Sequence, residues 1–393
     1  MVQPVEWARG VVTDVKAGSW PGVQLLGCAV GTRTIPALAY TALVGPLEPG
    51  CAVALNLNAW QLGLGTGGLG FVVARLDGGG GPADAPEPSA IGAAVQTGAG
   101  GPGGIPPDTG YLVKARYSPL QVVAQGVDSP GSPHHGVLAQ ATDLGGLPVV
   151  VADLHSSLPA ICAGALAAQP GLRLAYVMTD GAALPLVFSK TVARLRASGQ
   201  LCATITAGQA YGGDHEAASV HSALLAARHV ARADVAVAIQ GPGNLGTGTV
   251  WGFSGVAAGE AINAAAILGG RPVGCLRISG ADRRPRHRGL SHHSVTAYGQ
   301  VALRPADLVL PIFGPELGPE LVSLGGQVVA QARWLGPPWG IHHLVKVATD
   351  GLLEVLRAVP GLNTMGRGLE DDPAAFLAAA AAGRHAAALA ATG

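Results

Sequence analysis

The sequence contains little charge, few aromatic residues and almost no lysine. Asp, Glu, Lys and Arg make up 12% of its 393 residues, and Phe, Trp and Tyr only 4%, so the core must be built mainly from Ala, Val and Leu. With 24 basic and 24 acidic residues, the formal net charge is zero. This balance provides no global attraction to nucleic acid or to an anionic membrane. We therefore expect neither as a partner.

Long apolar runs and closely spaced cysteines are also missing. No stretch of about 18 apolar residues occurs, and the first residues, MVQPVEWARG, lack a basic region followed by an apolar one. The five cysteines are odd in number, widely spaced and never in C-x-x-C; they are Cys28, Cys51, Cys162, Cys202 and Cys275. Four lie in apolar segments, which is typical of reduced core residues. We expect a cytoplasmic protein without a membrane span.

Short apolar stretches separated by Gly and Pro turns fill residues 1–76. Examples are GVVTDVKA, VQLLGCAV and CAVALNLNAW. Strands at this spacing predict a small antiparallel β domain, either a barrel or a sandwich. Residues 77–110 are rich in Gly, Pro and Ala, and they are predicted to be a linker or a mobile loop.

Apolar strands alternate with helix-like segments in residues 111–393. The strand-like runs are LPVVVADL, RLAYVMTD, LCATITAG, DVAVAIQG, RPVGCLRIS and DLVLPIF. This alternation predicts an α/β domain with a doubly wound, mainly parallel, Rossmann-like sheet covered on both faces. An Ala-rich C-terminal helix, with Asp372 as its cap, is expected to dock on this domain or on a partner subunit. We expect a homo-oligomer.

Polar side chains concentrate in the loops that follow the predicted strands. Ligands bind outside the carboxyl ends of the strands in open parallel sheets. The first three loops carry Asp153, His155 and Ser156, then Asp180, then Asp214. Asp153, His155, Asp180 and Asp214 are predicted to hold a divalent metal ion or to act as acid and base, and Ser156 to bind ligand. Each also has a structural interpretation: Asp153 closes its strand, His155 and Ser156 suit the cap of the next helix, Asp180 suits a turn and Asp214 suits a helix cap.

The loop GPGNLG satisfies G-x-G-x-x-G with Gly241, Gly243 and Gly246. About ten further residues precede the next helix, and the following strand, CLRIS, ends without an acidic residue, so we expect no NAD or FAD. Together with Thr247 and Thr249, the loop is predicted to bind an anion through its backbone N–H groups. The alternative is a tight loop that needs glycine only for its conformation.

The segment RRPRHRGLSHHS joins arginines to histidines in the loop after the fifth strand. Arginine presents a planar fork suited to phosphate or carboxylate, and histidine can carry protons or bind metal. The alternative is a solvated charged loop. We predict that the arginines bind the anion and that His292 and His293 are catalytic, with His287 assisting; the arginines concerned are Arg283, Arg286 and Arg288.

Several of these motifs resemble a known family. VVVADLHSSLPAI, AYVMTDGAALPL, GQAYGGDHEA, GPGNLGTGTVWGFSG and RISGADRRPRHRGLSHHSVTAYG are similar to segments of a bacterial family known as domain of unknown function 3866. The resemblance covers most of the chain. It implies that the small β region and the α/β region form one recurring architecture, and it implies no activity.

Two classes of function remain open. The first is a hydrolase or transferase that acts on an anionic small molecule, such as a phosphorylated one, with the help of a metal ion. The second is a non-catalytic metabolite-binding or self-assembling protein.

Overall fold

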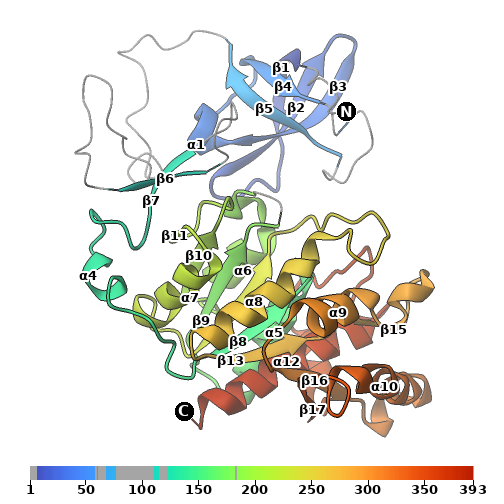
Figure 1. The fold of residues 1–393 in the computed structure, drawn as a ribbon. Coiled ribbons are helices and arrows are strands. Elements are labelled where there is room, and N and C mark those ends of the chain that lie inside the picture. Colours follow the sequence, from blue (N-terminus) through green and yellow to red (C-terminus); the bar gives the residue numbers. More distant parts are fainter. Residues whose placement is uncertain are drawn as a thin grey trace. The chain divides into compact units, whose positions relative to one another are not determined.

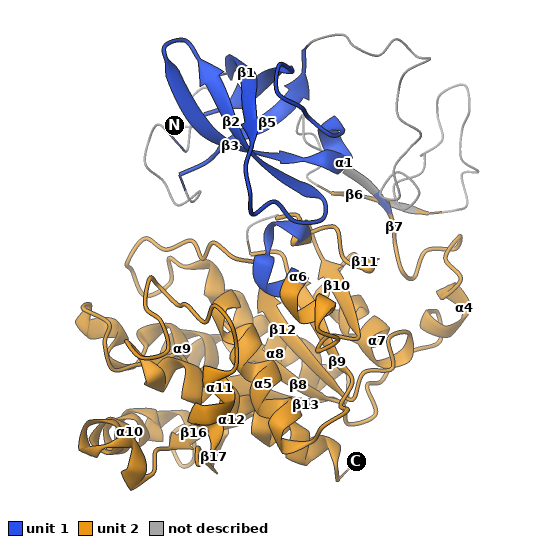
Figure 2. Cartoon of the chain, turned by 180° about the vertical axis from the view of Figure 1, so that it is seen from behind, with its two compact units in different colours: residues 1–107, 115–124, 187–193 blue, residues 108–114, 125–186, 194–393 orange. Residues whose placement is uncertain are grey.

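The computed structural model describes residues 7–57, 60, 68–76, 110–114, 122–181 and 184–392. The chain forms two compact units (Figure 2). Of the described residues, the first unit contains 7–57, 60, 68–76, 122–124 and 187–193, and the second unit contains the others. The segment 77–110, predicted to be a linker or loop, lies outside the described residues except for Gly110.

The first unit is a barrel whose strands follow the order β1-β2-β3-β5-β4. Strands β3 and β5 pair in parallel, whereas the other neighbours whose pairing is described are antiparallel. The predicted small β domain with antiparallel strands is therefore confirmed, and it takes the form of a barrel. Its elements are β1 (Trp7–Val15), β2 (Val23–Val30), β3 (Arg33–Tyr40), α1 (Thr41–Val44), β4 (Ala52–Asn56) and β5 (Gly70–Arg75).

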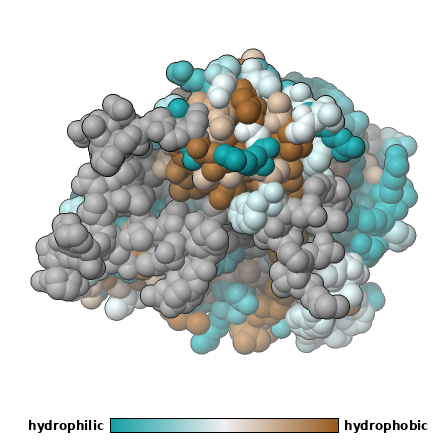
Figure 3. Space-filling model, turned by 90° about the horizontal axis from the view of Figure 1, so that it is seen from above, coloured by the Kyte–Doolittle hydropathy of each residue, from teal (hydrophilic) through white to brown (hydrophobic). Residues whose placement is uncertain are grey.

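The core of the barrel is built from small aliphatic side chains, as the low aromatic content requires. Leu26, Ile35, Val53 and Leu55 are buried within it, together with Cys28. Other apolar side chains of this unit are exposed, among them Trp7, Val11, Val15 and Leu43. On the face of the molecule shown in Figure 3, apolar residues gather around polar ones.

The second unit contains a parallel sheet of eight strands (Figure 1), with the order β11-β10-β9-β12-β8-β13-β16-β17. All of its neighbouring strands are parallel, which confirms the predicted α/β fold. The strands are β8 (Pro148–Ala152), β9 (Leu174–Thr179), β10 (Ala203–Ala207), β11 (His215–Ala217), β12 (Val235–Gln240), β13 (Arg271–Cys275), β16 (Asp307–Ile312) and β17 (His343–Ala348). Shorter strands are β6 (Tyr111–Lys114), β7 (Val122–Gln125), β14 (Ile278–Ser279) and β15 (Gly289–Leu290).

Helices cover both faces of this sheet. The chain passes from β8 to β9 and β10 in one direction and returns through β12 to β13, so right-handed crossovers place α5 and α7 on opposite faces. Helices α11 and α12 pack against α5, and α8 packs beside α7. The helices are α4 (His135–Leu138), α5 (Leu158–Ala168), α6 (Lys190–Ala197), α7 (Val220–His229), α8 (Ala257–Ile267), α9 (His292–Thr296), α10 (Pro319–Ala332), α11 (Leu352–Arg357) and α12 (Pro373–Ala390).

The Ala-rich C-terminal helix belongs to the core of its own chain. Asp372 and Pro373 begin α12 as predicted, although the side chain of Asp372 makes no capping hydrogen bond, and Ala378–Ala382 are almost completely buried. A Cβ at Gly164 of α5 would lie 2.0 Å from the backbone oxygen of Ala380, so the two helices touch backbone to backbone. The small-residue face of α12 is therefore used inside the fold, in agreement with docking on its own domain; a role of this helix in assembly stays a prediction.

One local prediction was wrong. Asp214 was interpreted as a helix cap, but His215–Ala217 directly after it form strand β11, which pairs with β10. The helix begins later, at Val220, where Ser219 and Ser222 form a capping box. Local cap preference is similar for Asp and Ser, and pairing with β10 decided between them.

All five cysteines are free, and only Cys202 is not fully buried, as expected of reduced core residues. Among the described helices, none is both long and apolar enough to cross a membrane.

Candidate metal centre

Three loops of the second unit meet at the carboxyl edge of its sheet. Strand β8 lies between β12 and β13, so the residues that follow these three strands are neighbours. Asp153 follows β8, Gln240 ends β12, and Arg277 follows β13. The side-chain Nε2 of Gln240 donates to the backbone oxygen of Asp153 at 2.7 Å. A parallel sheet whose outgoing loops turn to opposite faces leaves a crevice for ligands at this position.

Three histidines lie together beside this edge. His287, His292 and His293 each offer a ring nitrogen, and these nitrogen atoms lie within 4.8 Å of one another. His292 and His293 begin α9, which continues into a π-helical turn at Ala297–Val301. Such turns are frequent at functional sites. Among the described residues, these histidines are the one cluster of at least three His, Cys, Asp or Glu side chains that are close enough together to hold a metal ion.

Neighbouring side chains fix the orientation of the three rings. Ser291 Oγ lies 2.7 Å from Nδ1 of His287, and the ring of Phe253 stacks on that of His293 with centroids 3.7 Å apart. Nε2 of His292 is buried and has no hydrogen-bond partner among the described residues. A buried polar atom without a partner is costly, and a metal ion would satisfy it.

The imidazole of His293 can take either of two hydrogen bonds. Its Nδ1 lies 3.3 Å from Oδ2 of Asp153 and 3.0 Å from Nη1 of Arg277. If Nδ1 carries the proton, it donates to the carboxylate of Asp153 and Nε2 is free to bind a metal ion. In the other tautomer, Nδ1 accepts a hydrogen bond from Arg277. The first arrangement, in which a carboxylate orients a metal-ligating histidine, is common in metal sites.

Burial and nearby cations keep two of the three imidazoles neutral at physiological pH. The pKa of His287 falls to about 3 because the ring is buried and Arg277 lies nearby. Burial also lowers the pKa of His292, with smaller contributions from His293 and Arg286. Neutral imidazole is the form that binds metal, so these rings need not lose a proton to do so.

A buried ion pair offsets the positive charge beside the histidines. Oδ2 of Asp153 lies 3.5 Å from Nη1 of Arg277, and both side chains are almost completely buried. Burial alone would raise the pKa of Asp153, but the hydrogen bond from His293 and the charge of Arg277 together hold it below its ordinary value. Arg284 is paired with Asp282 through two nitrogen atoms, which leaves Arg286 as an exposed cation close to His292.

The structure does not bring the four predicted metal ligands together. His155 is buried beside Tyr176, whose hydroxyl lies 3.1 Å from its Nδ1, and burial lowers its pKa to about 4. Asp180 accepts from the backbone N–H of Gln209, and Asp214 accepts from the backbone N–H of Thr204 and pairs with Arg196. Of the four, Asp153 is the one beside the histidine cluster.

The glycine-rich loop closes on itself. Backbone N–H of Thr247 donates to the oxygen of Gly252 at 2.7 Å, and the hydroxyls of Thr247 and Thr249 lie 3.1 Å apart. Gly243 and Gly248 adopt positive φ angles, which favour glycine, whereas Gly241 and Gly246 do not. These bonds fit the conformational interpretation of the loop; anion binding by its backbone stays a prediction.

The predicted anion-binding arginines are exposed. Arg283, Arg286 and Arg288 all face solvent. Nη2 of Arg286 lies 3.5 Å from the position that a Cβ on Gly248 would take, so the arginine loop and the glycine-rich loop are neighbours. Ser156 does not cap the helix; its hydroxyl donates to Oγ1 of Thr364 at 2.9 Å.

Sequence reasoning missed Arg277, which touches both Asp153 and His293. A signal was present: Arg277 stands within the otherwise apolar run VGCLRIS, where a charged side chain requires a buried partner. Arg367 and Thr364 gave no such signal, because they lie in a turn far from the predicted loops in sequence.

The fold and this site define an α/β protein with a β-barrel unit and a buried histidine cluster at the carboxyl edge of its sheet. The chain belongs to the family described as protein of unknown function (DUF3866), whose model matches residues 36–383. No curated protein and no solved structure matches the chain.

Proposed function

We propose that this protein is a metal-dependent hydrolase or transferase that acts on an anionic small molecule, with its metal held by His287, His292 and His293. The observation that carries the proposal is the approach of three ring nitrogen atoms to within 4.8 Å. Three histidines that leave one coordination position open are typical of catalytic zinc sites, and imidazole also suits other divalent transition metals. Zn–N bonds of about 2.0–2.1 Å would draw the rings slightly inward.

A divalent ion in such a site activates water and polarises a substrate oxygen. The side chains of this protein contribute orientation and charge. Asp153 and Ser291 hold the rings of His293 and His287 through their Nδ1 atoms. Arg286, exposed beside His292, is positioned to bind an anionic group of the substrate. In hydrolysis of an ester, water adds to the acyl or phosphoryl group, and the alcohol leaves with a proton.

Metal analysis combined with an activity screen tests this proposal. We expect purified protein to contain close to one divalent transition metal ion per chain, and a screen of generic phosphoesters and carboxylic esters to detect turnover that a chelator abolishes. The variant His292→Ala should lose metal and turnover together. The variant His221→Ala changes an exposed histidine of α7 and should keep both. Absence of metal after incubation with zinc, manganese or nickel would reject the proposal.

Of the alternative, a non-catalytic metabolite-binding or self-assembling protein, the self-assembling form is favoured by one observation. Trp334 and Trp339 are exposed, and their rings pack edge to face with centroids 4.7 Å apart. Exposed aromatic pairs are common in protein interfaces. Light scattering of the wild type and of a Trp334→Ser, Trp339→Ser double variant would test this alternative; a mass of one chain for both would argue against it.

A further inference from the structure

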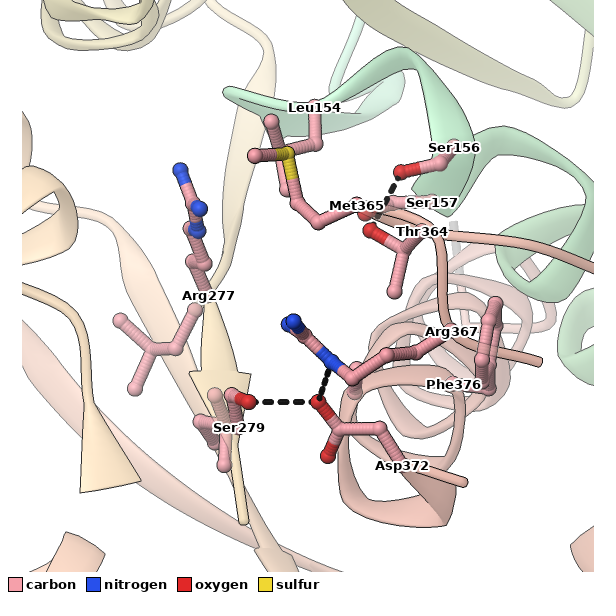
Figure 4. Close-up of a pocket in the computed structure, with 13 residues that line it drawn as sticks. Leu154, Ser156, Ser157, Arg277, Ser279, Thr364, Met365, Arg367, Asp372 and Phe376 are labelled. Atoms are coloured by element: carbon pink, nitrogen blue, oxygen red, sulfur yellow. Dashed lines mark hydrogen bonds and ion pairs between the residues drawn. The ribbon is translucent and has the colours of Figure 1, made fainter. Parts of the chain in front are cut away.

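A separate hollow lies on the side of Arg277 where the C-terminal helix begins. The first turn of α12, the loops after β8 and β13, and the turn Thr364–Arg367 line it. The space between them, part of which is open solvent, is about 400 Å³. The three histidines are not among its lining residues. Figure 4 shows Arg277 on one wall and Arg367 reaching in from the opposite wall, with Met365 extending across the top.

Arg277, which lines this hollow, has an unused hydrogen-bonding edge. Its Nη1 contacts Asp153 and His293, whereas its Nε and Nη2 make no hydrogen bond to any described residue. The side chain is only 8% exposed, yet these two nitrogen atoms are not sealed in the interior. The Nε and Nη2 pair is an edge that can bind a carboxylate or phosphate through two parallel hydrogen bonds. A buried arginine with this edge free therefore points to an oxyanion ligand.

The opposite wall is already neutralised by internal pairs. Arg367 donates from Nε to Asp372 at 3.1 Å, and its Nη2 lies 3.4 Å from Asp282. Asp372 also accepts from Ser279 and from the backbone N–H of Gly280. These bonds fix the side chains of this wall and use the charge of Arg367. Arg277 is therefore the residue that would bind an anion. A ligand with one small anionic group matches the site better than a highly charged one.

The turn over the hollow has an unfavourable residue at its tip. Two backbone hydrogen bonds join Thr364 and Arg367, because the N–H of each residue donates to the backbone oxygen of the other. Met365 and Gly366 between them have φ angles of 51° and 80°. Such a turn favours Asn, Asp or Gly at its first central position, and a methionine there costs conformational energy. Its side chain supplies apolar contact over the hollow, which suits a ligand with a short apolar part.

We propose that this hollow binds the carboxylate or phosphate group of a small metabolite through Arg277, at a site distinct from the histidine cluster. The site goes beyond the proposed hydrolase or transferase activity, because its ligand does not need the metal ion. The two sites share one contact, since the same arginine touches His293 and Asp153.

Calorimetric titration of the metal-free full chain tests the site. Acetate and inorganic phosphate are the probes, and chloride is the control anion. We expect saturable binding of at least one oxyanion; binding of acetate alone would identify a carboxylate site, and binding of phosphate alone a phosphate site. Arg277→Lys keeps the charge beside Asp153 but loses the planar fork, and it should weaken binding tenfold or more.

A second variant fills the hollow without removing a polar group. Ala375 lines the hollow on α12, and Ala375→Met should abolish binding. Matched controls are Ala388→Met at an exposed position of the same helix and Arg304→Lys at an exposed arginine; both should bind like the wild type. The proposal is overturned if neither oxyanion binds or if binding survives Ala375→Met. Metal analysis is a separate readout, so loss of the proposed activity and loss of this site are distinguishable.

Discussion

Asp153 and His293 are 140 positions apart in the chain, yet Oδ2 of the first lies 3.3 Å from Nδ1 of the second. The contact joins the loop after β8 to the start of α9 and is almost completely buried. It connects two features identified in the sequence: the acidic residue after an apolar strand and the histidine pair of the arginine-rich segment. This contact fixes the orientation of one of the three imidazoles of the proposed metal centre.

The first prediction concerns this pair. Asp153→Asn should lower metal affinity roughly 10- to 100-fold, because a ligating histidine loses the carboxylate that orients it. The same change leaves Arg277 buried beside a neutral side chain and should lower the free energy of unfolding by roughly 3 kcal/mol. Metal titration and urea unfolding measure the two effects separately, with His221→Ala as the control. An unchanged metal affinity in a folded variant would show that Asp153 does not position the ligand.

The second prediction concerns the packing of α5 against α12. A Cβ at Gly383 would lie 2.0 Å from the backbone oxygen of Ile161, and backbone cannot move away as a side chain can. Gly383→Ala should therefore lower the free energy of unfolding by at least 1–3 kcal/mol, about the effect of overpacking a core. Gly326→Ala in α10, where a Cβ meets nothing within 4 Å, should raise it by up to about 1 kcal/mol. Urea unfolding of both variants measures the two changes in the free energy of unfolding. Equal changes would contradict the backbone contact between α5 and α12.

These packing and site features show which parts of the structure sequence reasoning could reach. The apolar runs identified the strands and the polar loops after them, so Asp153 and the histidines were found. The position of β8 between β12 and β13 was not predictable, because an alternation of strands and helices in the sequence does not determine which strands become neighbours in the sheet. For this reason Asp180 and Asp214 looked equivalent to Asp153, although their side chains serve local turns and strands.

The third prediction concerns pH and the start of β16. Asp307 lies 2.8 Å from Nε2 of His385 on α12 and 3.1 Å from Nδ1 of His343 on β17. The hydrogen bond from His385, and to a smaller extent that from His343, holds the pKa of Asp307 below its ordinary value. A carboxyl group whose pKa is lower in the folded state stabilises the fold above its unfolded pKa of about 3.9. That stabilisation is lost as the pH falls through the folded value.

Comparison of the wild type with Asp307→Asn at several pH values checks this assignment. The variant should be less stable at pH 7 by on the order of 1 kcal/mol, since the pair is only partly shielded from solvent. The difference should shrink below about pH 4, because protonation then removes the charge in the wild type as well. Asp371→Asn, at an exposed position, serves as the control. A difference that grows as the pH falls below about 4 would have the wrong sign.

The last prediction follows from the place of Arg277 between the histidine cluster and the hollow. In the absence of ligand, Nη1 of Arg277 competes with Asp153 for Nδ1 of His293. An oxyanion in the hollow draws the guanidinium toward itself, so His293 keeps its proton on Nδ1 and its Nε2 is free for metal. The positive charge of a bound metal ion attracts the anion in turn.

Metal and oxyanion should therefore bind cooperatively, and each should raise the affinity of the other by the same factor, roughly fivefold or more. Zinc titrations with and without saturating acetate or phosphate, and the reverse titrations, measure this factor twice. Arg277→Lys should reduce it toward one, because a lysine can still pair with Asp153 but lacks a second hydrogen-bonding edge for the oxyanion. Equal metal affinities in the presence and absence of a bound oxyanion would show that the two sites are independent, and that Arg277 touches both without coupling them.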